Sequence, residues 1–197
     1  MDKEWWKKAI VYQIYPRSFS DSNGDGIGDI PGIISKLDYI SSLGVNVIWL
    51  SPVYASPNED NGYDISDYLS IHPDFGTMDD FDNLVKEADK RGIKIIMDLV
   101  INHTSSEHEW FQKSRKGIEP YKDFYYWSDS WPGTPNNWTG FFGGGTWEYD
   151  GERKASYLHL FAPHQPDLNY HNPLVWEKIE EQNNNEIQQQ VLRRHKV

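Results

Sequence analysis

Polar side chains follow directly on an apolar run near the middle of the chain. In the segment MDLVINH, Asp98, Asn102 and His103 supply a carboxylate, an amide and an imidazole. The run 93–100 is predicted as a buried strand, and parallel α/β sheets and barrels place their active sites at the carboxyl ends of such strands. Asp98 and His103 are therefore candidate active-site residues. A structural histidine, satisfied within the core, remains the alternative for His103.

The loop DSNGDGIGD places oxygen donors at alternate positions, between glycines that let the backbone curl. Hard cations such as Ca²⁺ prefer five or more oxygen ligands, with Mg²⁺ as the alternative. The donors of this candidate metal site are Asp21, Asn23, Asp25, the carbonyl of Ile27 and Asp29. An EF-hand is not expected, because its twelfth position is Gly32 here rather than glutamate, and a strand precedes the loop. A turn of Gly and Asp without metal remains an alternative.

Two further segments contain weaker candidates. Asp60 and Tyr63 follow the second predicted strand in NEDNGYDISDY, where a carboxylate beside a tyrosine is suited to hydrogen-bonding sugar hydroxyls. Capping of a loop by the aspartate explains the same pattern. Gln165 begins the turn QPDLN, which alone assigns no function.

The first half of the chain alternates strand and helix patterns. Strands are predicted at 9–15, 45–50 and 93–100, and helices at 32–43, after Pro31, and at 78–91. This β-α-β-α-β order predicts parallel strands with right-handed crossovers. The near-continuous apolar strands predict a sheet covered on both faces.

Composition changes after His103. Residues 104–166 are rich in Trp, Gly, Pro and Asn, with a strand-like segment at 157–161. A helix is predicted from Asn172, and it degenerates into a tail rich in Gln and Asn. We therefore expect three parts: 1–103 with the first three strands, 104–170 as an inserted irregular domain, and 171–197 as a helix with a divergent tail.

Charge and composition exclude several function classes. The 197 residues have a net charge of −11, which disfavours binding to nucleic acid and is compatible with neutral substrates. The absence of cysteine excludes disulfides and thiolate catalysis. No apolar run has the length of a membrane span or of a signal peptide, so we expect a cytoplasmic protein without a membrane partner. The sequence assigns no oligomeric state.

Taken together, the segments resemble a known family. VYQIYPRSF with DSNGDGIGD, GVNVIWLSPVY, NGYDISDY, MDLVINHTS and QPDLN occur in the order and spacing of the α-amylase superfamily of glycoside hydrolases. The sequence is most similar to the oligo-1,6-glucosidase and α-glucosidase branch, to which the QPDLN form points. The resemblance covers about residues 4–178.

This resemblance implies a fold and a reaction. The fold class would be α/β, a (β/α)₈ TIM barrel of which this chain holds the first three strands, with a domain B inserted after strand three. The reaction would be retaining hydrolysis of α-glucosidic bonds in short oligosaccharides, by two carboxyl groups about 5–5.5 Å apart.

The resemblance also implies the roles of individual residues. Asp60, Tyr63, Asp98 and His103 match positions around the sugar bound at the point of cleavage. Phe142 and Gln165 match wall residues contributed by the inserted domain. The five donors of the loop at 21–29 match the metal site of the family.

The chain departs from the family where the mechanism is concerned. The nucleophilic aspartate and the acid/base glutamate of the family lie on strand four and later strands, which do not occur in these 197 residues. An eight-stranded barrel typically needs about 250 residues. We therefore expect no glycosidase activity from this chain, an uncovered barrel interior and no catalytic residue within it. A non-catalytic sugar-binding or scaffold protein derived from the same fold is the alternative.

Overall fold

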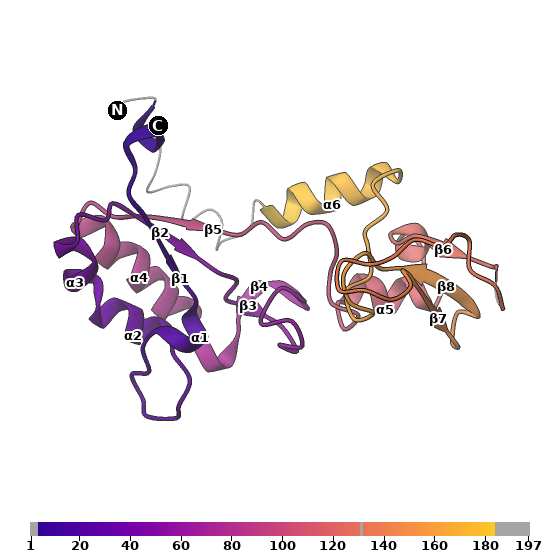
Figure 1. The fold of residues 1–197 in the computed structure, drawn as a ribbon, viewed down its shortest axis with the longest axis horizontal. Coiled ribbons are helices and arrows are strands. Elements are labelled where there is room, and N and C mark those ends of the chain that lie inside the picture. The colour runs from indigo at the N-terminus through magenta and orange to yellow at the C-terminus, as the bar shows by residue number, and fades with distance from the viewer. Residues whose placement is uncertain (1–3, 131, 184–197) are drawn as a thin grey trace. The chain divides into compact units, whose positions relative to one another are not determined.

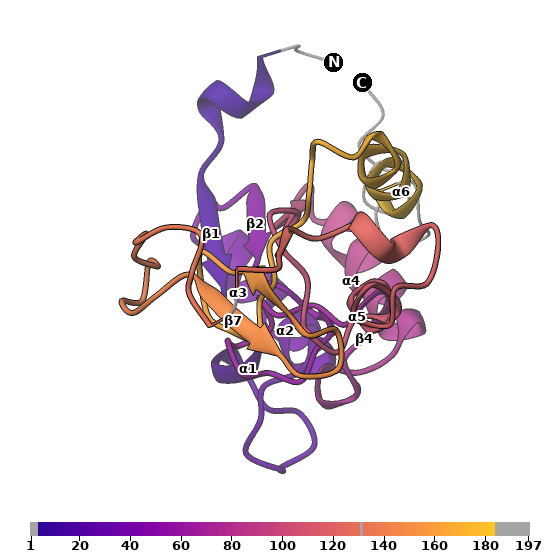
Figure 2. The same ribbon diagram turned by 90° about the vertical axis from the view of Figure 1, so that its right-hand side faces the viewer.

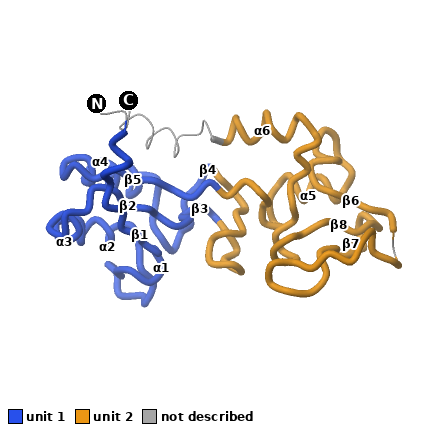
Figure 3. Tube along the Cα trace, turned by 45° about the horizontal axis from the view of Figure 1, so that its top comes forward, with its two compact units in different colours: residues 1–55, 69–99, 183–197 blue, residues 56–68, 100–182 orange. Residues whose placement is uncertain are grey.

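The computed structural model describes residues 4–130 and 132–183, which fall into two compact units. Unit 1 comprises residues 1–55, 69–99 and 183–197, and unit 2 comprises residues 56–68 and 100–182 (Figure 3). Unit 2 thus holds the loop 56–68 and most of the last helix in addition to the Trp- and Gly-rich segment. The tail predicted as divergent, from residue 184 on, lies outside the described residues.

Unit 1 is built on three parallel strands in the order β1-β2-β5 (Figure 1). The strands and helices in chain order are η1 (Trp5–Lys8), β1 (Val11–Ile14), α1 (Pro16–Phe19), α2 (Ile30–Ser35), α3 (Leu37–Ser42), β2 (Val47–Leu50), β3 (Tyr54–Ala55), β4 (Asp67–Ile71), η2 (Pro73–Phe75), α4 (Met78–Lys90) and β5 (Lys94–Met97). β3 and the following β4, which extends across the boundary of the units, form a separate two-stranded sheet. The predicted parallel strands are confirmed, each shorter than expected.

The two faces of the parallel sheet differ in cover. Ile48 and Ile95 are neighbours in register and fully buried. Helix α4 contacts β5 and α2, and Figure 1 shows both helices beside the sheet. On the opposite face, Val11 is 49% exposed and Ile96 is 39% exposed. The prediction of a sheet covered on both faces is therefore wrong for the described chain. Apolar strands alone do not reveal which of their faces other elements cover.

The prediction of one helix over 32–43 is also wrong in one respect. The structure has two helices there, α2 and α3, separated at Lys36. The hydroxyl of Ser35 donates to the carbonyl of Gly32 at 2.6 Å, and the Lys36 amide donates to the carbonyl of Ile33 at 3.0 Å. A serine hydroxyl that occupies a helical carbonyl competes with the regular backbone bond and interrupts the helix. The helix also begins earlier, at Ile30.

The second predicted helix agrees closely with α4. Thr77 and Asp80 form a reciprocal capping box at its start, with the Asp80 amide donating to the threonine hydroxyl at 3.2 Å. Gly92 follows its end with φ +69°, which favours glycine. Its buried face, including Phe81 and Leu84, packs toward α2 and β5.

Unit 2 combines a helix with an antiparallel sheet in the order β6-β8-β7. Its elements are α5 (Glu109–Arg115), η3 (Tyr121–Asp123), β6 (Trp127–Ser128), β7 (Trp147–Asp150), β8 (Ala155–Leu158) and α6 (Pro173–Asn183). The sheet and α5 are visible in orange and pink tones in Figure 2. The strand predicted at 157–161 therefore ends earlier, at Leu158.

An aromatic core holds unit 2 together. Phe111 lies at its centre, with ring centroids 5.1 Å from Tyr125, 5.0 Å from Tyr157 and 5.6 Å from Trp127. Such ring pairs contribute beyond their buried area. Much of the aromatic content of the chain thus fills a core. Among residues 4–130 and 132–183, no helix has the length and apolar character needed to cross a bilayer.

His108 is a buried titratable group at the start of α5. Its Nδ1 accepts a hydrogen bond from the Trp110 amide at 3.1 Å, and its ring lies 5.7 Å from that of Tyr68. Burial lowers the pKa of His108 to about 4, against the raising effects of Asp67 and Glu109. The imidazole is therefore neutral in the folded chain at pH 7.

The pKa of His108 predicts acid sensitivity. As the pH falls below 6.5, His108 takes up a proton in the unfolded chain but stays neutral in the folded chain. The free energy of unfolding therefore decreases between pH 6.5 and about 4. The loss amounts to about 3 kcal/mol. The substitution His108→Asn keeps a side chain that can cap α5 and removes this titration. Urea unfolding at pH 7, 5 and 4 should show a steeper decline for the native chain, and equal declines would contradict this assignment.

Candidate functional site

Two segments far apart in the sequence meet in unit 2. The Leu168 amide donates to the carbonyl of Asn102 at 3.0 Å, the Thr104 amide to that of Pro166 at 3.3 Å and the Ser106 amide to that of His164 at 2.8 Å. These bonds form a short antiparallel ladder between residues 102–106 and 164–168, with His103 opposite Asp167. We call it the 102/168 ladder. It brings the end of MDLVINH against QPDLN.

His103 is held from both sides of its ring. Nε2 lies 3.0 Å from the carbonyl oxygen of Tyr63, and Nδ1 lies 3.2 Å from the amide nitrogen of Asn102. A carbonyl only accepts and an amide NH₂ only donates, so we assign the neutral tautomer with the proton on Nε2. Burial lowers the pKa of His103, while the bond to Tyr63 and the charges of Asp60 and Asp64 oppose this.

Gln165 connects His103 to the loop that carries Asp60. Its side-chain oxygen accepts from the Ala162 amide at 3.1 Å, so its amide nitrogen faces Asp60 and donates to the carboxylate at 2.8 Å. The same nitrogen lies 3.2 Å from Nε2 of His103 and 3.4 Å from the Tyr63 carbonyl. Four of the six predicted substrate-binding residues, Asp60, Tyr63, His103 and Gln165, thus form one cluster.

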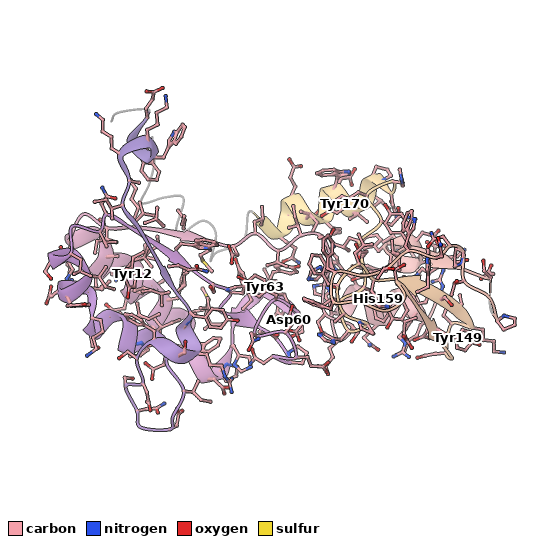
Figure 4. All side chains as sticks on the ribbon, in the orientation of Figure 1. Tyr12, Asp60, Tyr63, Tyr149, His159 and Tyr170 are labelled. Carbon is pink, nitrogen blue, oxygen red and sulfur yellow. The ribbon has the colours of Figure 1, made fainter. Side chains whose placement is uncertain are left out.

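The loop that carries Asp60 and Tyr63 is organised by a buried carboxylate. Asp64 is fully buried and accepts from the Ser56 hydroxyl at 2.9 Å, the Glu59 amide at 3.0 Å and the Asp60 amide at 3.1 Å. These three donors fix the loop backbone. Figure 4 labels Asp60 and Tyr63 on this segment, where the Tyr63 amide donates to the Asp60 carbonyl at 3.0 Å.

Two residues beside the cluster were not among the predicted site residues. Asn102 donates to Asp167 at 2.9 Å, and the Leu160 amide donates to the other oxygen of Asp167 at 2.7 Å. Burial raises the pKa of the Asp167 carboxyl, while these two bonds lower it. Both residues occur in the quoted motifs MDLVINH and QPDLN, but a contact over 65 positions leaves no local signal.

Aromatic rings extend from the cluster. Phe161 has its ring centroid 5.0 Å from His103, and Phe142 lies 6.0 Å from Phe161. The side chain of Phe142 is 65% exposed, so it approaches the cluster through Phe161 rather than by direct contact. Phe161 also stacks on Phe141 at 4.9 Å.

Asp98 belongs to unit 1, directly after β5. One of its oxygens accepts from the indole nitrogen of Trp49 on β2 at 2.6 Å. This bond joins the carboxyl ends of two neighbouring parallel strands, as expected for a residue at that edge of the sheet. Its role in binding substrate stays a prediction.

The loop of the predicted metal site curls around its own amides. Asp21 accepts from the amides of Asn23, Gly24 and Gly26, and the bonds from Gly26 and Gly24 lower the pKa of Asp21. Asn23 accepts from the Asp25 amide at 2.9 Å, and Asp25 from the Ile27 amide at 2.7 Å. A carboxylate has further lone pairs beyond these bonds, so this donor set is chemically suited to a hard cation.

Asp29 differs from the other donors of that loop. It is 4% exposed and caps α2, accepting from the Gly32 amide at 2.6 Å, while its second oxygen accepts from the amide and hydroxyl of Ser22. Gly32 must remain small, because an added Cβ would lie 2.0 Å from the carbonyl oxygen of Ser20. In the described chain, no three His, Cys, Asp or Glu side chains converge as a metal site.

The chemistry that the cluster offers is binding. Asp60 is paired with Gln165, and Asp167 is 3% exposed with both oxygens accepting hydrogen bonds. Around His103 the described residues of unit 2 therefore combine a neutral imidazole, an amide and the Asp60 carboxylate, of which one oxygen accepts from Gln165. Retaining hydrolysis requires two opposed carboxyl groups, one as the nucleophile and one as the acid, in addition to these binding residues.

Comparison with known proteins assigns the family. The family described as alpha amylase, catalytic domain, matches residues 13–192. The chain belongs to this family, and the match continues past the range covered by the quoted motifs. The chain is 60% identical to the oligo-1,6-glucosidase of Parageobacillus thermoglucosidasius over 183 residues, which is 92% of this chain and 33% of that protein.

Other relatives are named for different activities. The chain is 57% identical to the α-glucosidase of Apis mellifera, covering 87% of this chain and 31% of that protein. Among solved structures, the trehalose-6-phosphate hydrolase of Bacillus licheniformis is 57% identical, with a TM-score of 0.87 over 90% of this chain and 33% of the other. The trehalulose synthase of Pseudomonas mesoacidophila is 51% identical, with a TM-score of 0.88 over 92% and 33%.

These similarities confirm the predicted fold class, an α/β partial TIM barrel. The chain spans about a third of the length of the relatives it matches.

The environment of His103 predicts the effect of one isosteric change. In Asn102→Asp, position 102 carries an acceptor in place of the donor to Nδ1, so His103 should gain a second proton and become cationic at pH 7. Nitrogen chemical shifts of labelled imidazoles distinguish the two states. We expect a neutral ring protonated at Nε2 in the native chain.

The exposed ring of His171 serves as the internal control for that experiment. Its shifts should remain unchanged by Asn102→Asp. Thermal unfolding verifies that the variant is folded, with a loss of about 1–3 kcal/mol for the broken bond to Asp167. A native His103 ring protonated at Nδ1 instead of Nε2 would contradict the assigned tautomer.

Proposed function

We propose that this chain is the amino-terminal part of a retaining α-glucosidase of the oligo-1,6-glucosidase type, acting on α-glucosidic bonds of short oligosaccharides. The observation that supports this most is the cluster of Asp60, Tyr63, His103 and Gln165, joined by hydrogen bonds across 105 positions of sequence. Identities of 57–60% to an oligo-1,6-glucosidase and an α-glucosidase support the same class.

In this proposal each described residue binds or orients sugar. Asp60 accepts from sugar hydroxyls. His103 orients the loop of Asp60 through its Nε2–H bond to the Tyr63 carbonyl, and Gln165 holds Asp60 and His103 in register. Tyr63 completes the contacts within unit 2, while Phe142 and Phe161 pack against the C–H face of the sugar. Asp98 of unit 1 stays a predicted substrate-binding residue. The enzyme is proposed to be cytoplasmic.

The proposal names α-glucosidic bonds in general and no single linkage. Relatives at similar identity include a trehalose-6-phosphate hydrolase and a trehalulose synthase. The segment shared with them therefore supports recognition of a glucosyl unit rather than one acceptor.

A chimera tests the proposal directly. Residues 1–183 of this chain replace the aligned segment of the oligo-1,6-glucosidase of P. thermoglucosidasius, with which it shares 60% identity. We expect the chimera to hydrolyse p-nitrophenyl α-glucoside and isomaltose and to release glucose first as the α-anomer. His103→Ala in the chimera should reduce kcat/KM at least about 100-fold, because it removes a positioning contact.

The controls use the same assays. A surface variant of the chimera, Glu119→Gln, should retain full activity. The chain alone should give no hydrolysis above a buffer blank, because both carboxyl groups of the covalent route are missing from it. A folded but inactive chimera, or hydrolysis by the chain alone, would contradict the proposal.

The alternative, a non-catalytic sugar-binding module, is favoured by one observation, namely that the cluster closes entirely within unit 2. Isothermal titration of the chain with isomaltose distinguishes the two. Tight binding that His103→Ala abolishes would favour the binding module.

The loop at 21–29 is proposed to hold a structural Ca²⁺, with Mg²⁺ as the alternative. Asp21, Asn23, Asp25 and the Ile27 carbonyl supply the oxygens, and Asp29 supports the loop from its buried position. The bound ion would fix the loop between β1 and α2.

Added Ca²⁺ should therefore raise the unfolding temperature of the chain. At a concentration of 100 times Kd the stabilisation is about 2.7 kcal/mol. Asp21→Asn should abolish this increase, while the exposed Asp129→Asn should retain it. A native chain whose melting temperature does not respond to Ca²⁺ or Mg²⁺ would contradict the proposed site.

A further inference from the structure

Two hollows in unit 2 meet at a pair of tryptophans. They have volumes of about 300 Å³ and about 410 Å³, and Asn136, Trp138 and Trp147 line both. The larger volume lies in the range of small-molecule pockets, about 300–1,000 Å³. We call the two hollows together the tryptophan groove, because these three residues line both.

The tryptophans of the groove are held in place. The side-chain oxygen of Asn136 accepts from the Trp147 indole nitrogen at 3.1 Å and from the Trp138 amide at 3.2 Å. Trp138 is nevertheless 56% exposed. Asn136 thus holds the Trp147 indole and the backbone of Trp138. The half-exposed indole of Trp138 forms a surface on which another flat, apolar face can pack.

The larger hollow continues this aromatic character. Tyr126 and Tyr170 line it, over a floor that includes Leu158 and Leu168. Both leucines are buried, at 7% and 2% exposure. The hollow thus pairs an apolar floor with phenol rings at its walls.

The smaller hollow contains an unsatisfied hydroxyl. Thr146 is 1% exposed, and its Oγ1 has no hydrogen-bond partner among the described residues. A buried hydroxyl without a partner costs free energy that a bound hydroxyl group would recover. Thr146 lines the groove directly beside Trp147.

The charges around the groove favour a neutral occupant. Asp167 is the carboxylate among the lining residues, and both of its oxygens already accept hydrogen bonds. Neither hollow has a lysine or arginine among its described lining residues. An anionic ligand would find no fixed positive charge, and a cationic ligand no free carboxylate.

We propose that the tryptophan groove binds a neutral glucan segment of at least two sugar units, as a saccharide site separate from the His103 cluster. One sugar packs its C–H face on Trp138, and a hydroxyl of the chain bonds to Thr146. Asn102 and Asp167 border the larger hollow and also contact the ladder, so the site lies beside the cluster without using Asp60 or Gln165.

Saturation-transfer NMR with isomaltotriose tests this proposal on the 197-residue chain. We expect transfer from protein aromatic protons to the sugar, with Kd raised about fivefold or more in Trp138→Ala. Trp6→Ala is the matched control, since Trp6 lies in unit 1 and is 61% exposed. Its Kd should equal that of the native chain.

Two further variants separate this site from the cluster. Gln165→Ala should leave the transfer in place, so a loss there would locate the sugar in the cluster and overturn the groove. Thr146→Val keeps the shape of the side chain and removes the hydroxyl, and it should raise Kd about twofold or more. Unchanged far-UV circular dichroism verifies the fold of each variant.

The same experiments distinguish a bound sugar from other occupants of the groove. Absence of transfer in the native chain, or equal Kd values for Trp138→Ala and the native chain, overturns the proposal. So does a concentration-dependent dimer that Trp138→Ala abolishes, because the occupant is then a second copy of the chain. If the groove does not bind sugar but the chimera is active, only the groove proposal is contradicted, and the proposed enzymatic function is not.

Discussion

Three backbone hydrogen bonds position the candidate site. The 102/168 ladder places the end of the third parallel strand's loop against the turn QPDLN, more than 60 residues later. Without it, His103 and Gln165 would belong to separate irregular segments. The ladder is short and flanked by loops, so its geometry depends on the side chains packed around it.

A buried carboxylate reinforces the ladder from within. Asp167 stands opposite His103 and accepts from both the Leu160 amide and Asn102. Leaving such a group unpaired costs about 1–3 kcal/mol, so the ladder and the side-chain network favour the same arrangement. The amide of Asn102 then has one hydrogen left for Nδ1 of His103. The charge state of the imidazole is thereby connected to the backbone pairing.

Sequence patterns predicted the elements of unit 1 because those elements are local. The apolar pattern of the strands and of the buried face of α4 repeats within a few residues, so it can be read from short segments. The interruption at Lys36 was missed because it depends on a single serine hydroxyl rather than on periodicity. The apolar strands predicted cover on both faces, whereas the comparison with a whole barrel predicted an uncovered interior. The strand pattern failed because burial depends on elements outside the strands.

The site was predicted in part for a related reason. Family motifs identified Asp60, Tyr63, His103 and Gln165, and the structure brings these four together. Asn102 was noted only as part of the polar cluster after the third strand, and Asp167 was not noted. Their pairing is a tertiary contact without local spacing. The aromatic residues of domain B divide between a core around Phe111 and the lining of the tryptophan groove.

Amide hydrogen exchange of the intact chain tests the account most directly. The amides of Thr104, Ser106 and Leu168 donate across the ladder and should exchange as slowly as those of the β8 strand in the same unit. Exchange at the rate of an unstructured peptide at these three amides, with β8 still protected, would show that the ladder does not hold the candidate site.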